Sequence, residues 1–252
     1  MKIGLIGAMF EEIELLKSYM DIREIKTIAM REYYLGNIFG KEVVLVFSKY
    51  GKVAVASAVT TLIQVFSVDF VVFTGVAGAA DSTLNIGDIV IGDKLIQHDM
   101  DVSPLAVFSK YEIPLLGLTY FATENSIIEN AKSSALYYIE NVMNTEIAAQ
   151  YLDEFMITRP NVVVGTIASG DQFVADSNKV QSLCKDIDNL KCIEMEGAAL
   201  AHVCYENNIP FIVFRVISDK ADEHADINFP KFVEKAARYF TKGVLEQFIK
   251  LL

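Results

Sequence analysis

Two glutamates one residue apart, Glu194 and Glu196, form the pair in this chain whose spacing best suits chemistry. They follow the short apolar run at 190–193 and precede an alanine-rich segment with a helical pattern. Side chains two apart on an extended strand point to the same face, so both carboxylates could enter one pocket and there bind hydroxyl groups or move protons. Burying carboxylates without partners is costly, and a chain tolerates it where they have such a task. The alternative is two solvated acids, with Glu196 favouring the N-terminus of the next helix.

Other polar side chains lie at or just past the ends of expected strands. They are Glu12 after 2–8, the turn from Gly75 to Gly78 after 70–74, Ser169 and Asp171 after 161–169, and Ser218 and Asp219 at the end of 210–218. Ligands of parallel α/β sheets bind beyond the carboxyl ends of the strands, so these side chains predict one site. Arg215, inside the last strand, would be costly without a partner and is expected to meet one of the acids.

The elements that must position these side chains follow from apolar runs alternating with helical patterns. This alternation predicts an α/β fold, with one domain over residues 1–252 because no repeat or linker interrupts it. Strands are expected at 2–8, 31–38, 42–48, 70–74, 88–97, 161–169 and 210–218 and at the segment ending in Glu194. Helices are expected at 10–20, 52–66, 124–141, 176–187, 197–207 and 230–250.

The composition sets limits on partners and location. Hydrophobic residues make up 52% of the 252 residues, which is enough for a large core. A net charge of −11 argues against binding nucleic acid or an anionic membrane, since both require a basic surface. The apolar start at 1–8 is short and runs into acidic residues, so it predicts a first strand rather than a signal peptide. With no long apolar run, we expect a cytoplasmic protein.

The cysteines and histidines give no sign of a metal site. Cys184, Cys192 and Cys204 form no CxxC pair and are expected to be reduced thiols. The stretch from His98 to Asp101 contains potential ligands, but the three histidines are scattered along the chain. Of the other two, His202 has the spacing of a helix-core residue, and His224 lies in an acidic loop where it would be solvated. We therefore expect neither a metal nor an organic cofactor.

The segment 102–121 is apolar but is interrupted by Pro104, Pro114 and Gly117. These residues disfavour both a helix and a strand. An apolar loop of this kind is often covered by a partner subunit, which favours a homodimer. The alternative is that the loop packs against its own domain.

Six segments together resemble the 5′-methylthioadenosine/S-adenosylhomocysteine nucleosidases, which belong to the purine nucleoside phosphorylase and uridine phosphorylase superfamily. They are MKIGLIGAMFEEIE (1–14), FTGVAGA (73–79), GDIVIGDKLIQHDMDV (87–102), SGDQFV (169–174), CIEMEGAALAHVC (192–204) and PFIVFRVISDKAD (210–222). They occur in the family's order over nearly the whole chain. The resemblance implies a nucleoside phosphorylase-like fold, namely a mixed central sheet, partly barrel-like, flanked by helices.

The same resemblance implies how the chain would work. Glu12 resembles the acid that positions and deprotonates the attacking water, and Arg215 resembles the basic residue beside that water. Asp219 resembles the acid that protonates N7 of the adenine leaving group. Glu196 resembles the carboxylate that binds the ribose hydroxyls, with Met195 under the sugar. The reaction would release adenine by hydrolysis of an N-ribosidic bond, through an oxocarbenium-like state.

The remaining implied residues contact the substrate. Phe173 would stack on adenine while the backbone of Val174 reads its edge, and Val102 and Leu105 would reach the neighbouring subunit's pocket. The alkylthio group would lie among Met9, Tyr50, Met195 and Phe229. The implied substrate-binding set also includes Val76, Gly78, Glu194 and Ser218.

Two positions depart from the family pattern. Val76 stands where the family often has a serine near the water, and Tyr50 is bulkier than the expected aliphatic residue. Both keep open a hydrolase for another 5′-substituted nucleoside, such as a futalosine-type substrate. A nucleoside phosphorylase is a further alternative, but it needs an anion site, and only Arg215 lies near the expected edge.

A non-catalytic nucleoside-binding protein on the same fold is the alternative from another class. The presence of both Glu12 and Asp219 argues against it, because a binding protein needs no proton donor after a strand end. Asp219→Asn would separate the two, since a binding protein keeps its affinity and an enzyme loses its turnover.

Overall fold

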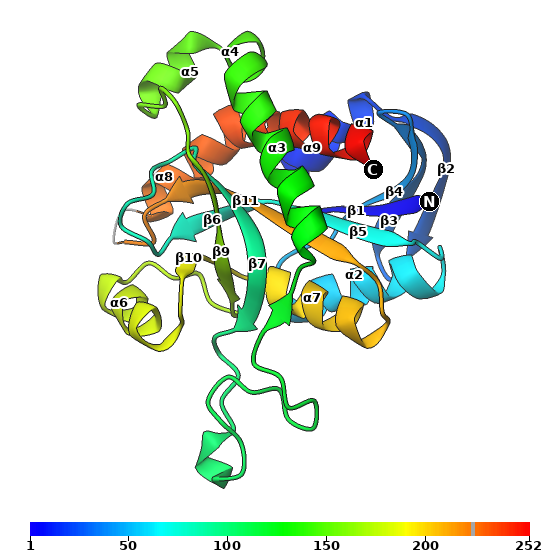
Figure 1. Cartoon of the computed structure of the whole chain (residues 1–252). Coiled ribbons are helices and arrows are strands. Elements are labelled where there is room, and N and C mark those ends of the chain that lie inside the picture. The colour runs from blue at the N-terminus through cyan, green and yellow to red at the C-terminus, as the bar shows by residue number, and fades with distance from the viewer. Residues whose placement is uncertain (223–224) are drawn as a thin grey trace.

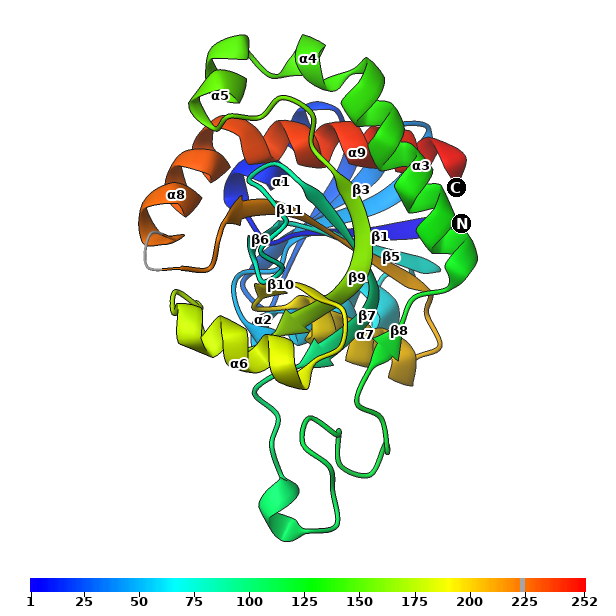
Figure 2. The ribbon, with the colours of Figure 1, turned by 60° about the vertical axis from the view of Figure 1, so that its left-hand side comes forward.

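A single mixed sheet organises the molecule, and part of it curves into a ring (Figures 1 and 2). The computed structural model describes residues 1–222 and 225–252, apart from the side chains of 226–228. The strands within these residues are β1 (Lys2–Gly7), β2 (Asp21–Ile28), β3 (Arg31–Ile38), β4 (Lys41–Phe47), β5 (Phe70–Thr74), β6 (Val76–Ala79), β7 (Ile89–Gln97), β8 (Phe121–Ala122), β9 (Val162–Ser169), β10 (Leu190–Glu194) and β11 (Phe211–Asp219).

The strand order explains the ring. In the described part of the chain, β11, β6, β10, β9 and β7 pair in that sequence, and β7 pairs back onto β11. An open wing of β2, β3, β4, β1 and β5 extends from β11 on its other side. The predicted mixed, partly barrel-like sheet is therefore confirmed. β10 is parallel to β9, and β11 is parallel to β6, but β10 and β6 are antiparallel, so the two pairs run in opposite directions.

Helices cover the sheet on two sides. They are α1 (Phe10–Ser18), α2 (Lys52–Gln64), α3 (Asn125–Asn141), α4 (Met143–Glu146), α5 (Ala149–Glu154), α6 (Ser177–Asp186), α7 (Gly197–Glu206), α8 (Ala225–Phe232) and α9 (Arg238–Leu251), with a 3-10 turn η1 (Ser103–Leu105) and a π-helical turn η2 (Val233–Ala237). Helices α1, α3 and α9 lie on one side, and α2 and α7 lie on the other (Figure 1). No described helix is long and apolar enough to cross a membrane.

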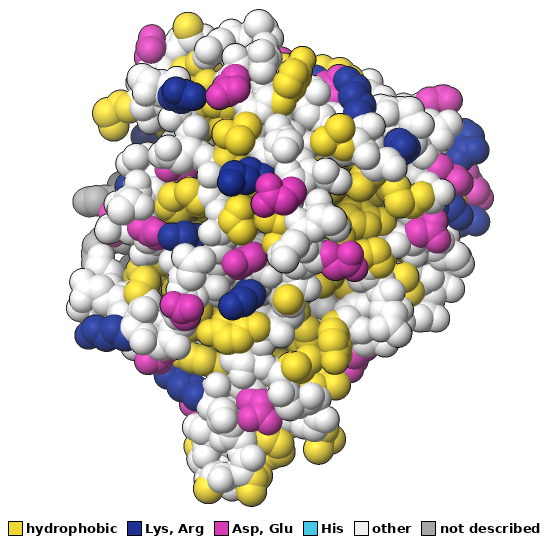
Figure 3. Space-filling model, in the orientation of Figure 1, with side chains coloured by type: hydrophobic (Ala, Val, Ile, Leu, Met, Phe, Trp, Pro, Cys, Tyr) yellow, Lys and Arg dark blue, Asp and Glu magenta, His cyan; other side chains and the backbone are white. Residues whose placement is uncertain are grey.

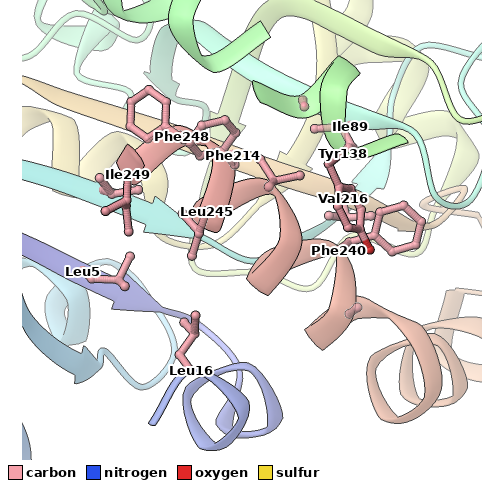
Figure 4. Close-up of a cluster of buried hydrophobic side chains, with 14 of the residues drawn as sticks. Leu5, Leu16, Ile89, Tyr138, Phe214, Val216, Phe240, Leu245, Phe248 and Ile249 are labelled. Carbon is pink, nitrogen blue, oxygen red and sulfur yellow. The ribbon is translucent and has the colours of Figure 1, made fainter. Parts of the chain in front are cut away.

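Each side of the sheet has its own hydrophobic core. The core under α1, α3 and α9 joins aromatic residues of α9 to the sheet: Phe248 lies beside Phe214 of β11, and Phe240 lies beside Tyr138 and Val216 (Figure 4). The second core joins α2 and α7 to the opposite side. Helix α9 approaches α3 so closely that a Cβ on Gly243 would lie 1.9 Å from the ring of Tyr138. This packing holds α9 firmly against the sheet.

Three strands were not predicted, namely β2, β6 and the two-residue β8. β2 was missed because it is an edge strand whose side chains are mostly exposed, so it needs no apolar alternation. Residues Val76–Ala79, expected as a turn, form β6 between β10 and β11. A four-residue strand that contains Gly78 has no pattern of its own, and its neighbours in the sheet supply its hydrogen bonds.

Two further expectations change in the structure. The helix expected at 230–250 begins at Ala225, passes through η2 and ends at Leu251, so Pro230 lies inside α8. His202 is half-buried at the margin of α7 rather than in the core, with its ring stacked 4.9 Å from that of Phe121. All three cysteines are free, as predicted, although Cys184 is exposed. The prediction that His224 is solvated falls outside the described residues.

The segment between β7 and β8 projects from the body of the molecule (Figures 1 and 2). As predicted, it forms little regular structure, with only η1 and an isolated bridge from Ile113 to Leu118. Hydrophobic side chains are visible on its tip in Figure 3. Its most exposed large apolar residues are Leu105 at 66%, Val107 at 75% and Leu115 at 95%. The alternative that this loop packs on its own domain is therefore wrong for these three side chains.

Candidate active site

The carboxyl ends of β10 and β11, the strand β6 between them and the segment after β9 surround a pocket with about 570 Å³ of empty space, open solvent included. It is lined by twelve predicted substrate or acid residues: Met9, Tyr50, Val76, Gly78, Phe173, Val174, Glu194, Met195, Glu196, Ser218, Asp219 and Phe229. Ala8, Ala77, Gln172 and Ile193 also line it and were not predicted. The convergence of distant strand ends on one pocket is thus confirmed.

Four predicted residues do not line this pocket. Glu12 and Arg215 are completely buried beside it, each with 0% exposure. Val102 and Leu105 lie on the projecting segment, outside the pocket of their own chain. Their predicted place in a neighbouring subunit's pocket therefore stays a prediction.

Glu12 lies in the first turn of α1, directly after the pocket residues Ala8 and Met9. Its Oε1 accepts a hydrogen bond of 2.7 Å from the hydroxyl of Thr241 on α9. No hydrogen bond of good geometry reaches Oε2 from the described residues. Burial raises the pKa of Glu12 from 4.5 to about 7, against the opposing effects of Thr241 and Arg215. A carboxyl group with this pKa can exchange a proton near neutral pH.

Arg215 is held by an internal ion pair. Its Nε donates to Oε2 of Glu194 at 3.2 Å, its Nη2 donates to the same oxygen, and its Nη1 donates to the carbonyl of Phe214 at 2.9 Å. The guanidinium also lies 4.0 Å from the centre of the Phe73 ring. The expectation that Arg215 meets one of the acids is confirmed. Because Glu194 neutralises it, Arg215 offers little free positive charge to the pocket.

Glu194 connects three elements of the site. Besides Arg215, its carboxylate accepts hydrogen bonds from the hydroxyl of Ser169 and from the backbone N–H groups of Glu196 and Gly197 at 3.1 and 2.9 Å. It therefore caps the N-terminus of α7 as well as facing the pocket. Glu194 ends β10, whereas Glu196 already lies at the cap of α7. The two carboxylates share the pocket because the chain turns there, not through strand alternation.

Glu196 faces the pocket from the start of α7. Its Oε1 accepts a hydrogen bond of 2.8 Å from the backbone N–H of Gly51. Burial, and secondly the charge of Glu194, raise the pKa of Glu196 to about 7. Gly51 has a φ of +88°, and a Cβ there would lie 2.9 Å from Oδ1 of Asp171, so only glycine fits. Glycine at 51 thus allows the donor to reach Glu196.

Asp219 ends β11 and is 2% exposed. Its Oδ2 accepts a hydrogen bond of 2.7 Å from the hydroxyl of Ser218, and its Oδ1 accepts one of 2.8 Å from the N–H of Ala221. Burial raises the pKa of Asp219 despite these two donors. A Cβ on Gly78 would lie 2.9 Å from Oδ1 of Asp219, so glycine at 78 lets β6 pass close to this acid.

Aromatic side chains stand at the edge of the pocket. Phe173 is 51% exposed, and its ring is in an edge contact with that of Phe229, with centroids 5.7 Å apart. Tyr50 is 60% exposed and contacts the ring of Phe47 at 5.9 Å. Such exposed rings provide flat apolar faces for a planar or apolar ligand. Together, the acids and rings suit a ligand with hydroxyl groups, a protonatable leaving group and an aromatic base.

The comparisons with known proteins agree with this site. Residues 2–250 match the model of the family described as "Phosphorylase superfamily". The fold and site thus define a member of that superfamily, and the chain belongs to it.

The individual relatives indicate to which family within the superfamily the chain belongs. The 5′-methylthioadenosine/S-adenosylhomocysteine nucleosidase of Bacillus licheniformis is 38% identical over 97% of both chains. The crystal structure of the Neisseria meningitidis enzyme of the same name, in complex with methylthio-immucillin-A, has a TM-score of 0.87 and 34% identity over 100% of this chain and 99% of that one. Futalosine hydrolase of Helicobacter pylori has a TM-score of 0.82 and 32% identity over 100% and 98%. This chain belongs to the 5′-methylthioadenosine/S-adenosylhomocysteine nucleosidase family.

Some residues of the site carried no sequence signal. Thr241 lies 229 positions from Glu12, and nothing in its helical surroundings marks it. Ser169 was noted only at a strand end and in the SGDQFV segment, and Gly51 was not singled out. A buried carboxylate still requires hydrogen-bond donors. The signal that could have identified Thr241 is therefore a hydroxyl residue on the face of an expected helix that packs on the sheet.

Proposed function

We propose that the protein hydrolyses the N-ribosidic bond of 5′-methylthioadenosine and S-adenosylhomocysteine, releasing adenine and the thio-ribose. The observation that carries the proposal is a pair of buried acids with raised pKa values: Asp219 lines the pocket, and Glu12 lies behind its Ala8–Met9 wall. Hydrolysis of a glycosidic bond uses such a pair, one acid for the leaving group and one base for the water. The nucleosidases named above provide independent support.

The proposed reaction assigns one task to each group. The bond between C1′ and N9 breaks, its electron pair goes to adenine, and Asp219 delivers a proton to N7. A water oxygen bonds to C1′ while its proton passes to Glu12, whose Oε2 has no other good hydrogen bond among the described residues. Glu196, in its ionised form, accepts hydrogen bonds from the 2′ and 3′ hydroxyls. Phe173 stacks on the base, and Met195 lies under the sugar.

Hydrolysis is favoured over phosphorolysis by the charge of the pocket. Glu194, Glu196 and Asp219 line it, whereas none of its described lining residues is Lys or Arg. Arg215 is already paired with Glu194. A phosphate ion would meet carboxylates rather than the cationic donors that bind it in other proteins.

We expect adenine release from 5′-methylthioadenosine at the same rate with and without added phosphate. The measurement follows free adenine from the purified full-length protein. Release that depends on phosphate would contradict the proposal and place the chain among the phosphorylases. With no release under either condition, a different nucleoside must be the substrate, and futalosine-type compounds are then assayed.

The futalosine-type alternative is supported by two features. The H. pylori futalosine hydrolase shares the fold over the whole chain. Tyr50, which is exposed at the pocket, also adds a hydroxyl near the position proposed for the 5′ substituent. A parallel assay of both substrate types compares their kcat/KM values, and we expect 5′-methylthioadenosine to have the higher value.

We also propose that the protein acts as a homodimer in which Val102 and Leu105 reach the partner's pocket. The exposed apolar side chains on the projecting segment support this, because solvating them is costly. Leu105→Asp is expected to weaken dimerisation and raise KM for the nucleoside, since a charge opposes burial at an apolar contact.

The oligomeric state of wild type and variant is measured by light scattering after gel filtration, together with KM. Met156→Asp is the matched control, because Met156 is 86% exposed on a different part of the surface. A wild-type protein that is monomeric at assay concentration would contradict the proposed dimer. The proposal would also be contradicted if Leu105→Asp had the oligomeric state and the KM of wild type.

A further inference from the structure

A buried pair of threonines stands behind Glu12, on the side away from its unbonded oxygen. Thr241 is 2% exposed and Thr74 is 1% exposed. The Thr241 hydroxyl donates to Oε1 of Glu12 at 2.7 Å and lies 3.1 Å from the Thr74 hydroxyl. Three separate elements, α1, α9 and the end of β5, thus meet in one short chain of hydroxyl and carboxyl groups.

The direction of these hydrogen bonds follows from the number of protons. Each hydroxyl has one proton, so when Thr241 donates to an ionised Glu12, Thr74 must donate to Thr241. Oε1 of Glu12 then has a fixed donor in a buried, low-dielectric place, where hydrogen bonds to charges are strong. Oε2 is left to accept a proton. The arrangement therefore distinguishes the two oxygens of one carboxylate.

We infer that Thr241 is a positioning residue for the reaction, which holds Glu12 through Oε1 so that Oε2 receives the proton of the attacking water. The inference deepens the proposed function and depends on it for the role of Glu12. Thr241 does not line the pocket, so it acts only through Glu12.

Helix α9 holds the threonine in place through contacts that do not involve Glu12. Lys242 is 5% exposed; its Nζ is paired with Glu146 and, at 2.7 Å, with Glu246, and it lies 4.7 Å from the centre of the Tyr19 ring. The close approach of Gly243 to Tyr138 adds a second anchor. Replacing one hydroxyl by a methyl group should leave these contacts, and the fold, in place.

Several groups affect Glu12 besides Thr241. The Arg215 guanidinium on β11 and, more weakly, the Met9 backbone N–H favour its ionised form, and Glu11 on the same helix opposes it. The hydroxyl of Tyr50, a residue that lines the pocket, also interacts electrostatically with Glu12. Thr241→Val leaves all of these unchanged, so any shift in the titration of Glu12 reports the lost hydroxyl.

We expect Thr241→Val to lower kcat for 5′-methylthioadenosine about tenfold with little change in KM, because a hydrogen bond to a charged group is lost. The acid limb of the kcat/KM profile should move about one unit toward higher pH, since a carboxylate without its donor binds protons more tightly. Thr241→Ser keeps the hydroxyl and should restore both values.

The matched control is Thr166→Val. Thr166 lies in β9, and its buried hydroxyl donates to the carbonyl of Asp188 at 2.9 Å. Thermal unfolding of every variant shows whether the fold is retained. If Thr241→Val keeps the wild-type kcat and acid limb, or if Thr166→Val changes them equally, the inference is wrong.

A second measurement does not depend on activity. The protein is labelled with ¹³C at the glutamate carboxyl groups, the Glu12 signal is assigned by its loss in Glu12→Gln, and its pKa is read from a pH titration. We expect a higher pKa in Thr241→Val than in wild type or Thr241→Ser. An unchanged pKa overturns the inference, whereas an inactive wild type with a shifted pKa overturns only the proposed function.

Discussion

Asp219→Asn is expected to reduce kcat for 5′-methylthioadenosine by about 10²–10⁴-fold or more, the usual contribution of a general acid. Asparagine can keep its one oxygen toward the N–H of Ala221, with its NH2 group in place of Oδ2 as a donor, but it cannot transfer a proton to N7. Adenine would then have to leave as an anion, which is a much poorer leaving group. Adenine formation is measured in a single turnover, with the enzyme in saturating excess over the substrate, so that slow product release does not mask the effect.

The same variant distinguishes an enzyme from a binding protein. We expect Asp219→Asn to bind adenine within a few-fold of wild type, measured by calorimetry, while its turnover falls. Asp81→Asn is a suitable control, because this aspartate is paired with Lys191 and does not line the pocket. Turnover retained in Asp219→Asn would exclude this residue as the acid and would leave the donor to N7 unassigned.

Glu12→Gln is expected to lower kcat/KM by a similar factor above pH 7 and to remove the acid limb of the pH profile. In wild type that limb should lie near pH 7, because the pKa of Glu12 is about 7 and the base must be ionised to accept a proton. Glutamine accepts the Thr241 hydrogen bond but has no basic oxygen for the proton of water. The profile is measured from pH 5 to 9 with 5′-methylthioadenosine.

Glu11→Gln is the control for this variant, since Glu11 is the adjacent acid on α1 and does not line the pocket. Removing its charge should move the acid limb slightly toward lower pH, because Glu11 raises the pKa of Glu12. An unchanged acid limb in Glu12→Gln would assign that limb to another group, and Glu196, whose pKa is also about 7, would be the next to test.

Glu12 should also make stability depend on pH in a defined direction. Its carboxyl keeps a proton up to about pH 7 in the folded protein, but loses it near 4.5 when unfolded. The folded state therefore binds more protons between these values, and its free energy of unfolding falls as pH rises through this window. Relative to Glu12→Gln, wild type should lose about 3 kcal/mol between pH 4 and pH 8, measured by urea unfolding.

The site residues that could be predicted from the sequence were those attached to strand ends. Glu196 and Asp219 follow apolar runs, and such runs identify buried strands without reference to the rest of the fold. The acids converge on one pocket although β10 and β11 run in opposite directions, because β6 pairs with both strands and Gly78 lies beside both Ile193 and Asp219. The expectation from parallel strand ends thus identified the right side chains, but the antiparallel pairing of β10 with β6 is what brings them together. The family resemblance then supplied chemical roles that the spacing of the residues could not.

Other features could not be read from local patterns. β6 exists because β10 and β11 provide its hydrogen bonds, and β2 is an exposed edge with no apolar alternation. The sequence did not indicate which acid pairs with Arg215. In the structure the partner is Glu194, because β10 and β11 belong to the same ring of strands. The position of Leu105 relative to a second subunit depends on contacts that no single chain contains.

The sequence by itself determined the α/β class and most strands and helices, because each depends on neighbouring residues, and the family resemblance indicated most of the side chains that line the pocket. Only the tertiary structure decided which groups hold the acids: Thr241 against Glu12, Gly51 against Glu196, and Arg215 against Glu194. Hydrogen bonds and burial depend on distances between residues far apart in the chain, and these distances, with the pKa values that follow from them, are set when the elements pack.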